Sequence, residues 1–429
     1  MQVVCSLSFG FAFTFLLCAQ TVLPKDVIQL ARLKRDVVAS LAMLDNYTCV
    51  ETIDRSDRRN AREPFHHRDT LHLEVAVAHG NELYAWPGAG QFEEGDLAGF
   101  VGGGMISTGN FETAIRSVLL NNVSEIKFHG EEEISGRNAL RWDYTIPYNV
   151  SGWTVHIRGH GGLVSEAGSF WADAETLQLL RLQSSARDIP PDLFVASITN
   201  TIEYARIRMR SKDLLLPQSI ELLVTDMKGA ETGNRIEFSQ CREFAGAANL
   251  SFDQPATTVA GMPAPAEEIE VPAGLEFSVH LAQVIDSNVA AVGDRITAVF
   301  DAPVHYHGSV LIPKGALLEG RLRRLVHFTS PHSHYLVGLE FSAIQFAGGR
   351  VRFTGEMVGI SQIPGLTLNL STSKTFTTDY GVAGSVVKST TDSEFPVQIP
   401  GVGSFFMEGA AFRLAQGTEM TWRTSRLKK

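Results

Sequence analysis

Alternation of apolar and polar residues with a period of two dominates the chain from Tyr47 to about Phe252. In the clearest stretch, four apolar residues alternate with polar or small ones: Leu71, Leu73, Val75 and Val77. This pattern is typical of strands that bury one face of a sheet. The Gly- and Pro-containing connections are too short for crossover helices, so we predict one large, curved antiparallel sheet.

Two segments of this first part have helical patterns instead. Residues 24–46 place apolar side chains at helical spacing along a wide face, with Pro24 near the start. Asn110 can cap a second helix over Phe111–Leu120, and the glycine-rich sequence 99–109 before it suits a hinge or lid. We therefore expect two helices that pack on the sheet.

The second part of the chain is separated from the first by a linker. Residues 254–270 are rich in Pro and Ala and lack apolar periodicity, which is typical of an interdomain segment. We expect one domain over residues 21–253 and another over residues 271–429. Short strands and Gly/Pro turns in the latter predict a small, closed or nearly closed β-barrel. The Ser/Thr-rich sequence Ser371–Glu394 is expected to be a long excursion from this barrel.

A short apolar phrase containing a glycine recurs in the second domain, over Val271–Val279, Leu311–Leu322 and Leu414–Trp422. In the middle copy Pro313 fixes φ, and Gly315 permits a tight bend after it. The repeat therefore predicts corners at which strands enter the barrel, and no chemistry.

The amino-terminal residues predict export. Residues 3–17 are apolar and are followed by Cys18-Ala19-Gln20, so residues 1–20 are expected to be a signal peptide cut near Ala19. The alternative is that the segment stays as a membrane anchor, since it approaches the length of a span. Either case predicts a periplasmic or otherwise exported, envelope-associated protein.

Two cysteines lie outside this leader, Cys49 and Cys241. In an exported protein an isolated pair favours a disulfide, because the compartment is oxidising. Two unrelated buried thiols are the alternative.

The first domain resembles the lipoprotein-carrier superfamily of LolA, LolB and RseB. The resemblance rests on the order of elements: an amphipathic helix, a strand that begins NYTC, and an antiparallel meander. The hairpin Gly168–Gln183, with an Asp-centred turn, is similar to one in that superfamily. The resemblance implies an unclosed β half-barrel whose covering helices enclose a cavity for acyl chains.

The second domain is similar to the β-barrel of TrbI-type conjugation proteins, which form channels in type IV secretion systems. The matching phrases are Val271-Pro272-Ala273-Gly274, Ile285-Asp286-Ser287, Leu311-Ile312-Pro313-Lys314-Gly315 and Gly417-Thr418-Glu419. This chain lacks the antenna insertion of that family, so the resemblance does not imply a channel.

Charge and motifs argue against several functional classes. The net charge is −10, without a dense basic patch, so we expect no nucleic-acid partner. Asp173 and Glu175 fall in a predicted turn, so they are not expected to form the carboxylate pair of a glycosidase. The S-x-x-K sequences lie outside any predicted helix, so they are not expected to supply the nucleophile of a serine acylase. The histidines could offer zinc ligands but lack a tight ligand motif; they are His305, His307, His327, His332 and His334. We therefore expect no metal, no cofactor and no enzymatic activity.

Aromatic residues are concentrated in the first domain and could line an apolar pocket. The candidates are Trp86, Phe111, Trp142, Tyr144, Trp153 and Trp171. We expect a protein that binds a lipid, acyl chain or lipoprotein there and docks through its barrel onto an envelope protein. The alternative is a scaffold or sensor with a filled half-barrel that binds a partner protein.

Overall fold

The structure is a computed structural model, and it describes part of the chain. Described are residues 23–43, 47–78, 81–89, 92, 97–100, 104–108, 111–157, 160–209, 212–243, 271–330, 332–347, 349–368, 386–390 and 399–426. The predicted leader, the linker and the domain boundaries drawn at residues 20 and 253 lie outside these residues.

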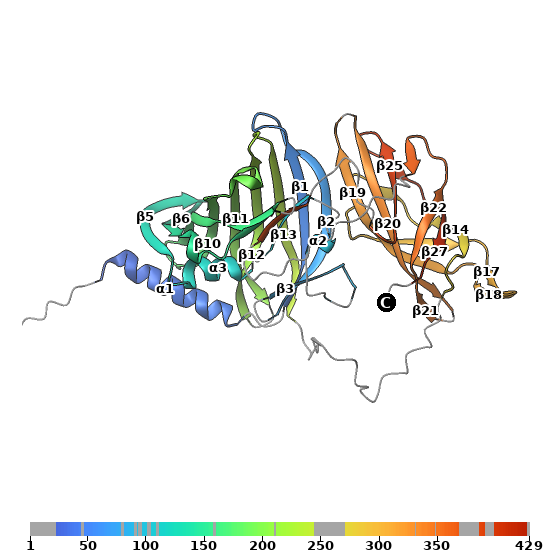
Figure 1. Cartoon of the computed structure of the whole chain (residues 1–429). Helices are drawn as coiled ribbons and strands as arrows, with labels where there is room; N and C mark the ends of the chain where they lie inside the picture. The colour runs from blue at the N-terminus through green and yellow to red at the C-terminus, as the bar shows by residue number, and fades with distance from the viewer. Residues whose placement is uncertain are drawn as a thin grey trace, which may run out of the picture.

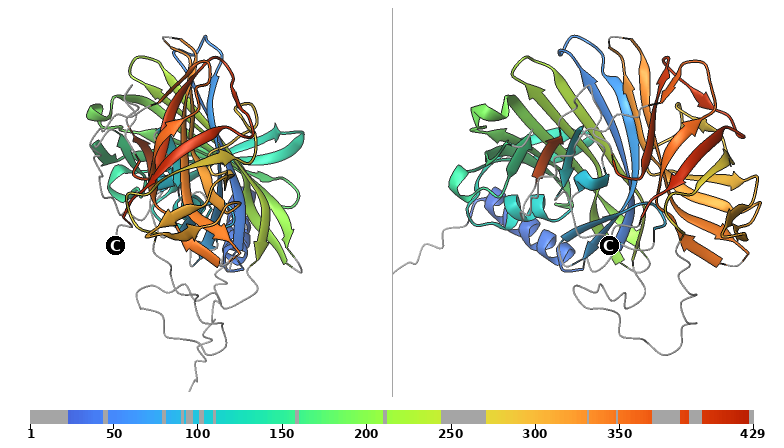
Figure 2. Two further views of the ribbon diagram at one scale, coloured as in Figure 1. Left: turned by 90° about the vertical axis from the view of Figure 1, so that its right-hand side faces the viewer. Right: turned by 45° about the vertical axis from the view of Figure 1, so that its right-hand side comes forward.

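The first part is built on the predicted antiparallel sheet, which has ten strands in the order β3-β2-β1-β13-β12-β11-β10-β9-β6-β5 (Figure 1). Their bounds are β1 (Tyr47–Arg58), β2 (His66–Ala78), β3 (Asn81–Ala85), β5 (Glu125–Ile134), β6 (Arg137–Ile146), β9 (Ser165–Asp173), β10 (Leu179–Arg187), β11 (Val195–Met209), β12 (Lys212–Asp226) and β13 (Glu231–Glu243). The sheet curves strongly around one face, hereafter the inner face, and its end strands β3 and β5 do not pair with each other (Figure 2). An unclosed, mainly β half-barrel is therefore present.

The first predicted helix is α1 (Lys25–Leu41), which packs against β12. Its buried positions are Leu33, Val37, Ser40 and Leu41, at the spacing of a helix face. The apolar pattern is wider than this contact, because Val27 and Val38 remain 41% and 50% exposed. Among the described residues, no helix combines the length and apolarity of a membrane span.

Short elements cover the inner face. They are α2 (Leu97–Phe100), α3 (Thr113–Ile115), a turn of π-helix η1 (Arg116–Leu120) and a small sheet in the order β4-β24-β7-β8. The helix predicted over Phe111–Leu120 thus begins two residues later, at α3, and changes to π-helical hydrogen bonding at Arg116. Its predicted cap, Asn110, lies outside the described residues.

The small sheet joins distant parts of the chain. Its bounds are β4 (Gly104–Thr108), β7 (Thr154–Ile157), β8 (His160–Leu163) and β24 (Val386–Thr390). Strand β24 comes from within the predicted Ser/Thr-rich excursion, pairs antiparallel with β4, and pairs parallel with β7. The predicted excursion from the barrel therefore reaches the first part, where these residues complete the small sheet. The remainder of that segment is not described.

The second part is the predicted nearly closed barrel. Its main sheet follows the order β22-β27-β14-β16-β19-β20-β25-β23, with β21 paired to β20. The strands are β14 (Glu276–Leu281), β16 (Arg295–Phe300), β19 (Leu317–Phe328), β20 (His334–Phe346), β21 (Gly349–Arg352), β22 (Gly355–Ile360), β23 (Leu366–Leu368), β25 (Val402–Glu408) and β27 (Glu419–Thr424). Two short pairs flank it, β15 (Ile285–Asp286) with β26 (Arg413–Leu414) and β17 (Val304–Tyr306) with β18 (Ser309–Ile312).

The repeated glycine phrase has the predicted architectural role. Gly274, Gly315 and Gly417 have φ values of +90°, +84° and +87°, respectively. Each stands two residues before a strand, namely β14, β19 and β27. These φ values lie in the left-handed region that glycine adopts without steric cost.

The two parts meet along β2. The backbone N–H of His72 donates to the Val292 carbonyl, and the N–H of Val292 donates to the Thr70 carbonyl, each at 2.8 Å. The ring of His72 also lies 3.0 Å from an Asp294 carboxylate oxygen. This junction places β19 beside β2, as both views show (Figures 1 and 2).

Candidate functional site

An unbroken row of apolar side chains crosses the inner face of the half-barrel. Strand register places one member on every strand of the ten-stranded sheet except β3: Phe128, Trp142, Phe170, Leu182, Ile202, Ile220, Ile236, Ile53 and Leu71. Phe128, at the sheet edge, is 39% exposed, and the others are buried. The inner face therefore carries a continuous hydrophobic strip, the apolar strip, which runs across the strands and is shielded from solvent except at Phe128.

The neighbouring row, two residues along each strand, is largely polar although it is buried. Tyr144 O–H donates to Glu166 at 2.6 Å and lies 2.7 Å from Ser184 Oγ. Asn234 Nδ2 donates to the Met105 carbonyl of β4, which ties the sheet to its cover. The row ends on β1 and β2 at the buried ion pair of Arg55 and Asp69. The polar atoms of this row limit the strip on this side, whereas on the other side apolar side chains such as Leu140, Ala172 and Leu73 continue the core.

A third group of side chains, hereafter the interior polar cluster, lies on the inner face near β1 and β3. It comprises Tyr47, Glu51, Glu82, Tyr84, Glu112 and Tyr204. Glu82 is the hub: one carboxylate oxygen accepts from Tyr84 O–H at 2.7 Å, and the other accepts from the Phe111 backbone N–H at 2.9 Å. Glu112 accepts from Arg116 Nε at 2.8 Å.

Burial controls the protonation of this cluster. Glu51 is 1% exposed, and its burial, together with the nearby charge of Glu82, raises the pKa of its carboxyl from 4.5 to about 8. Burial also raises the pKa values of the Tyr47, Tyr84 and Tyr204 hydroxyls. At neutral pH these four groups therefore keep their protons and can donate hydrogen bonds.

The protonation of Glu51 predicts a pH dependence of stability. Between pH 5 and pH 8 the folded state holds a proton on Glu51 that the unfolded state has lost, so stability falls as pH rises. Glu51→Gln is expected to remove this contribution. Urea unfolding of both proteins from pH 5 to pH 9 checks it: the stability difference should grow in favour of Glu51→Gln until about pH 8 and then stay constant. Parallel pH profiles would contradict the assignment.

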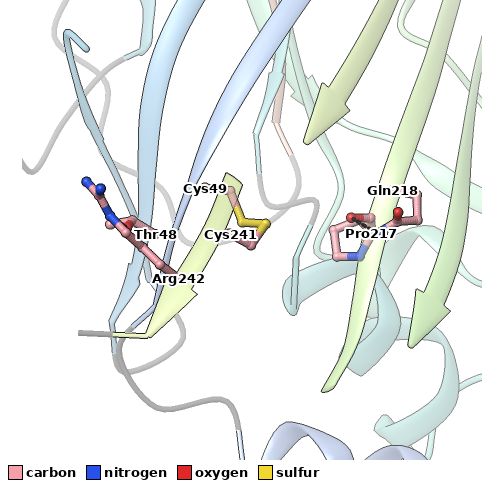
Figure 3. Close-up of a disulfide and its surroundings, with 6 residues drawn as sticks. All are labelled: Thr48, Cys49, Pro217, Gln218, Cys241 and Arg242. Carbon is pink, nitrogen blue, oxygen red and sulfur yellow. Dashed lines mark hydrogen bonds between the residues drawn. A yellow bond between two sulfur atoms is a disulfide. The ribbon is translucent and has the colours of Figure 1, made fainter. Parts of the chain in front are cut away.

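The predicted disulfide is present and borders this cluster. Cys49 of β1 is bonded to Cys241 of β13, with their Cα atoms 4.0 Å apart (Figure 3). Tyr47 and Glu51 stand two residues to either side of Cys49 and share its face of the strand. The interpretation of the cysteines as separate thiols is therefore wrong.

The six predicted aromatic residues do not form one site. Phe111, Trp142 and Tyr144 belong to the main inner core, where Trp142 stacks on Phe170 with ring centroids 5.4 Å apart. Trp153 belongs to a separate apolar cluster around β7. Trp171 lies on the outer face, where the guanidinium groups of Arg141 and Arg181 approach its ring.

Trp86 lies at the junction between the two parts. Its ring lies 5.0 Å from Phe100 of α2 and 4.6 Å from the Arg323 guanidinium of β19. Trp86 therefore connects the barrel to the cover of the half-barrel. A ligand-binding role for these aromatics stays a prediction.

The interior polar cluster is not among the sites that the sequence predicts. One local signal was available: a disulfide cysteine with period-two neighbours places Tyr47 and Glu51 on its own face. The approach of Glu82 and Tyr204 to them depends on the curvature of the sheet and has no local signal. No group of three or more His, Cys, Asp or Glu residues within the described ranges is arranged to hold a metal ion.

Comparisons with known proteins return no matching family and no matching curated protein. Among solved structures, the chain is similar to a putative outer membrane lipoprotein-sorting protein domain from Vibrio parahaemolyticus, at 11% identity and a TM-score of 0.29 over 51% of this chain and 93% of the other. A DUF1329 family protein from Desulfovibrio piger is 13% identical, with a TM-score of 0.25 over 52% and 92%. A LolA superfamily protein from Nitrosomonas europaea is 7% identical, with a TM-score of 0.25 over 50% and 94%.

Proposed function

We propose that this chain is a non-enzymatic protein of the bacterial cell envelope that binds the acyl chain of a lipid or lipoprotein inside its half-barrel. The observation that carries the proposal is the apolar strip, which crosses almost the whole inner face from Phe128 to Leu71. An extended hydrocarbon chain matches such a strip in shape. Burial of the chain would supply about 25 cal/mol per Å² of apolar surface. The proposal rests on these side chains and not on the structural similarities.

The cover is built in a way that suits ligand entry. It includes single turns and short strands, among them α2, α3, η1 and β4, and the long helix α1 packs beside them against β12 and η1. Phe111 packs edge-on against Tyr47 and Phe238, with centroid distances of 5.7 and 4.6 Å. An entering acyl chain would replace these apolar contacts with its own, so opening the cover need not leave apolar surface in water.

Purification under mild conditions, followed by lipid extraction and native mass spectrometry, tests the proposal. We expect co-purified lipid, and after its removal we expect saturable binding of the apolar fluorophore N-phenyl-1-naphthylamine. A lipid-free protein that also fails to bind the fluorophore would favour the second candidate described below.

Two substitutions on β12 locate the binding site. Ile220→Phe adds a ring to the apolar strip and is expected to weaken fluorophore binding several-fold, because it occupies space on the inner face. Glu221→Phe adds the same ring to the exposed outer face, one residue away, and should leave binding unchanged. Thermal unfolding checks that both variants fold, since overpacking costs roughly 1–3 kcal/mol. Equal binding by both variants would place the fluorophore outside the half-barrel.

The second candidate is a scaffold or sensor that binds an envelope protein through the barrel. It is favoured by the hairpin of β17 and β18, where Tyr306 and Val310 are 39% and 56% exposed. The similarity of the barrel to TrbI-type proteins stays a prediction.

A further inference from the structure

Several buried polar groups lack a hydrogen-bond partner among the described residues, and three of them belong to the interior polar cluster. These three are Tyr47 OH, Glu51 Oε2 and Tyr204 OH. Their residues are 1%, 1% and 5% exposed, respectively. A buried polar group without a partner costs about 1–3 kcal/mol, so three in one region call for a physical explanation.

The three groups are electrostatic neighbours of Glu82 on the inner face. Tyr47 and Glu51 lie on one face of β1, on either side of the disulfide, and Tyr204 faces inward from β11. Tyr47 interacts electrostatically with both Tyr204 and Glu82, while Glu51 and Tyr204 each interact with Glu82. They therefore converge on the interior polar cluster, beside the apolar strip.

The chemistry of the cluster selects one kind of ligand group. All three groups carry protons at neutral pH and can donate hydrogen bonds. Glu82 already accepts two hydrogen bonds, from Tyr84 and Phe111. Its carboxylate, together with that of Glu112, would repel an anion. Neutral donors that lie beside carboxylates favour a ligand with an uncharged hydrogen-bond acceptor. A carbonyl oxygen is such an acceptor, and its two lone pairs can take two of these hydrogen bonds.

We propose that Tyr47, Tyr204 and Glu51 bind a neutral acyl ester or amide, with two of the three donating to its carbonyl oxygen, and that its hydrocarbon chain lies along the apolar strip. This inference rests on the proposed function and adds the polar group of the ligand. Phe111 covers Tyr47, so it moves aside when the ligand enters. The ligand class is then a glyceride, an acylated lipoprotein amino terminus or another neutral acyl derivative, and not a free fatty acid anion.

Competition with bound N-phenyl-1-naphthylamine tests the inference. The competitors are decane, methyl decanoate, decanoate and decylammonium. Methyl decanoate should displace the fluorophore at a concentration about ten-fold lower than decane, since one or two hydrogen bonds are gained. The double variant Tyr47→Phe/Tyr204→Phe should reduce this advantage to about two-fold or less without changing displacement by decane.

Tyr84→Phe is the matched control, because the Tyr84 hydroxyl already donates to Glu82. It should keep the preference for the ester. Equal displacement by decane and methyl decanoate in the wild type, or strongest displacement by decylammonium or decanoate, would overturn the inference while leaving the proposed function intact. If the fluorophore itself does not bind, the proposed function fails, and this inference fails with it.

Discussion

Replacing both Cys49 and Cys241 by alanine is expected to lower the free energy of unfolding by about 5 kcal/mol. The two residues are 192 positions apart in sequence. Their bond removes the conformational freedom of that long loop from the unfolded chain. In the folded protein it joins β1 to β13, the first and the last strands of the ten-stranded sheet along the chain. The bridge thus ties the two ends of the first part together.

Urea unfolding followed by tryptophan fluorescence measures this effect. A reductant should lower the unfolding midpoint of the wild type towards that of the double variant and should leave the variant unchanged. The eleven paired positions between β1 and β13 remain available, so the variant is expected to fold. If the double variant has the same unfolding midpoint as the oxidised wild type, the disulfide contributes nothing to stability.

Asp69→Asn is expected to lower the free energy of unfolding by about 3–5 kcal/mol. Arg55 of β1 donates from Nε and Nη2 to the two carboxylate oxygens of Asp69 on β2, at 2.6 and 2.5 Å. The side chains are only 3% and 1% exposed, so water cannot replace the carboxylate that the substitution removes. The large effect follows from the buried cation that remains, and it does not measure the net value of the intact pair.

An exposed ion pair supplies the control for this second prediction. Arg423 and Glu276 are similarly close in the barrel, but their side chains are 46% and 51% exposed. Glu276→Gln is therefore expected to cost only about 0–1 kcal/mol. The paired replacement Arg55→Met/Asp69→Leu should recover much of the stability lost in Asp69→Asn, because no charge is then left buried. Equal losses for Asp69→Asn and Glu276→Gln would show that burial does not govern the strength of the Arg55 pair.

Several features of this protein were determined by the sequence alone. The period-two pattern around Leu71 predicted antiparallel strands, because alternation is a local property of an extended chain with one buried face. Gly274, Gly315 and Gly417 marked the corners of the barrel, because only a few backbone conformations are open to the residues that turn a chain. The Cys49–Cys241 bond was predicted from composition, since only two cysteines lie outside the predicted leader.

Tertiary structure decided which of these residues act together. Trp142, Trp153 and Trp171 look equivalent in sequence but lie in three different clusters, because register and curvature direct each to a different surface. Strand β24 joins β4 and β7 across hundreds of residues, and its polar sequence gave no sign of that pairing. The convergence of Tyr204 with Tyr47 and Glu51 arises because the sheet curves, which brings together strands that a flat sheet would hold apart. The candidate site is thus a product of sheet geometry, whereas the sheet itself is a product of local alternation.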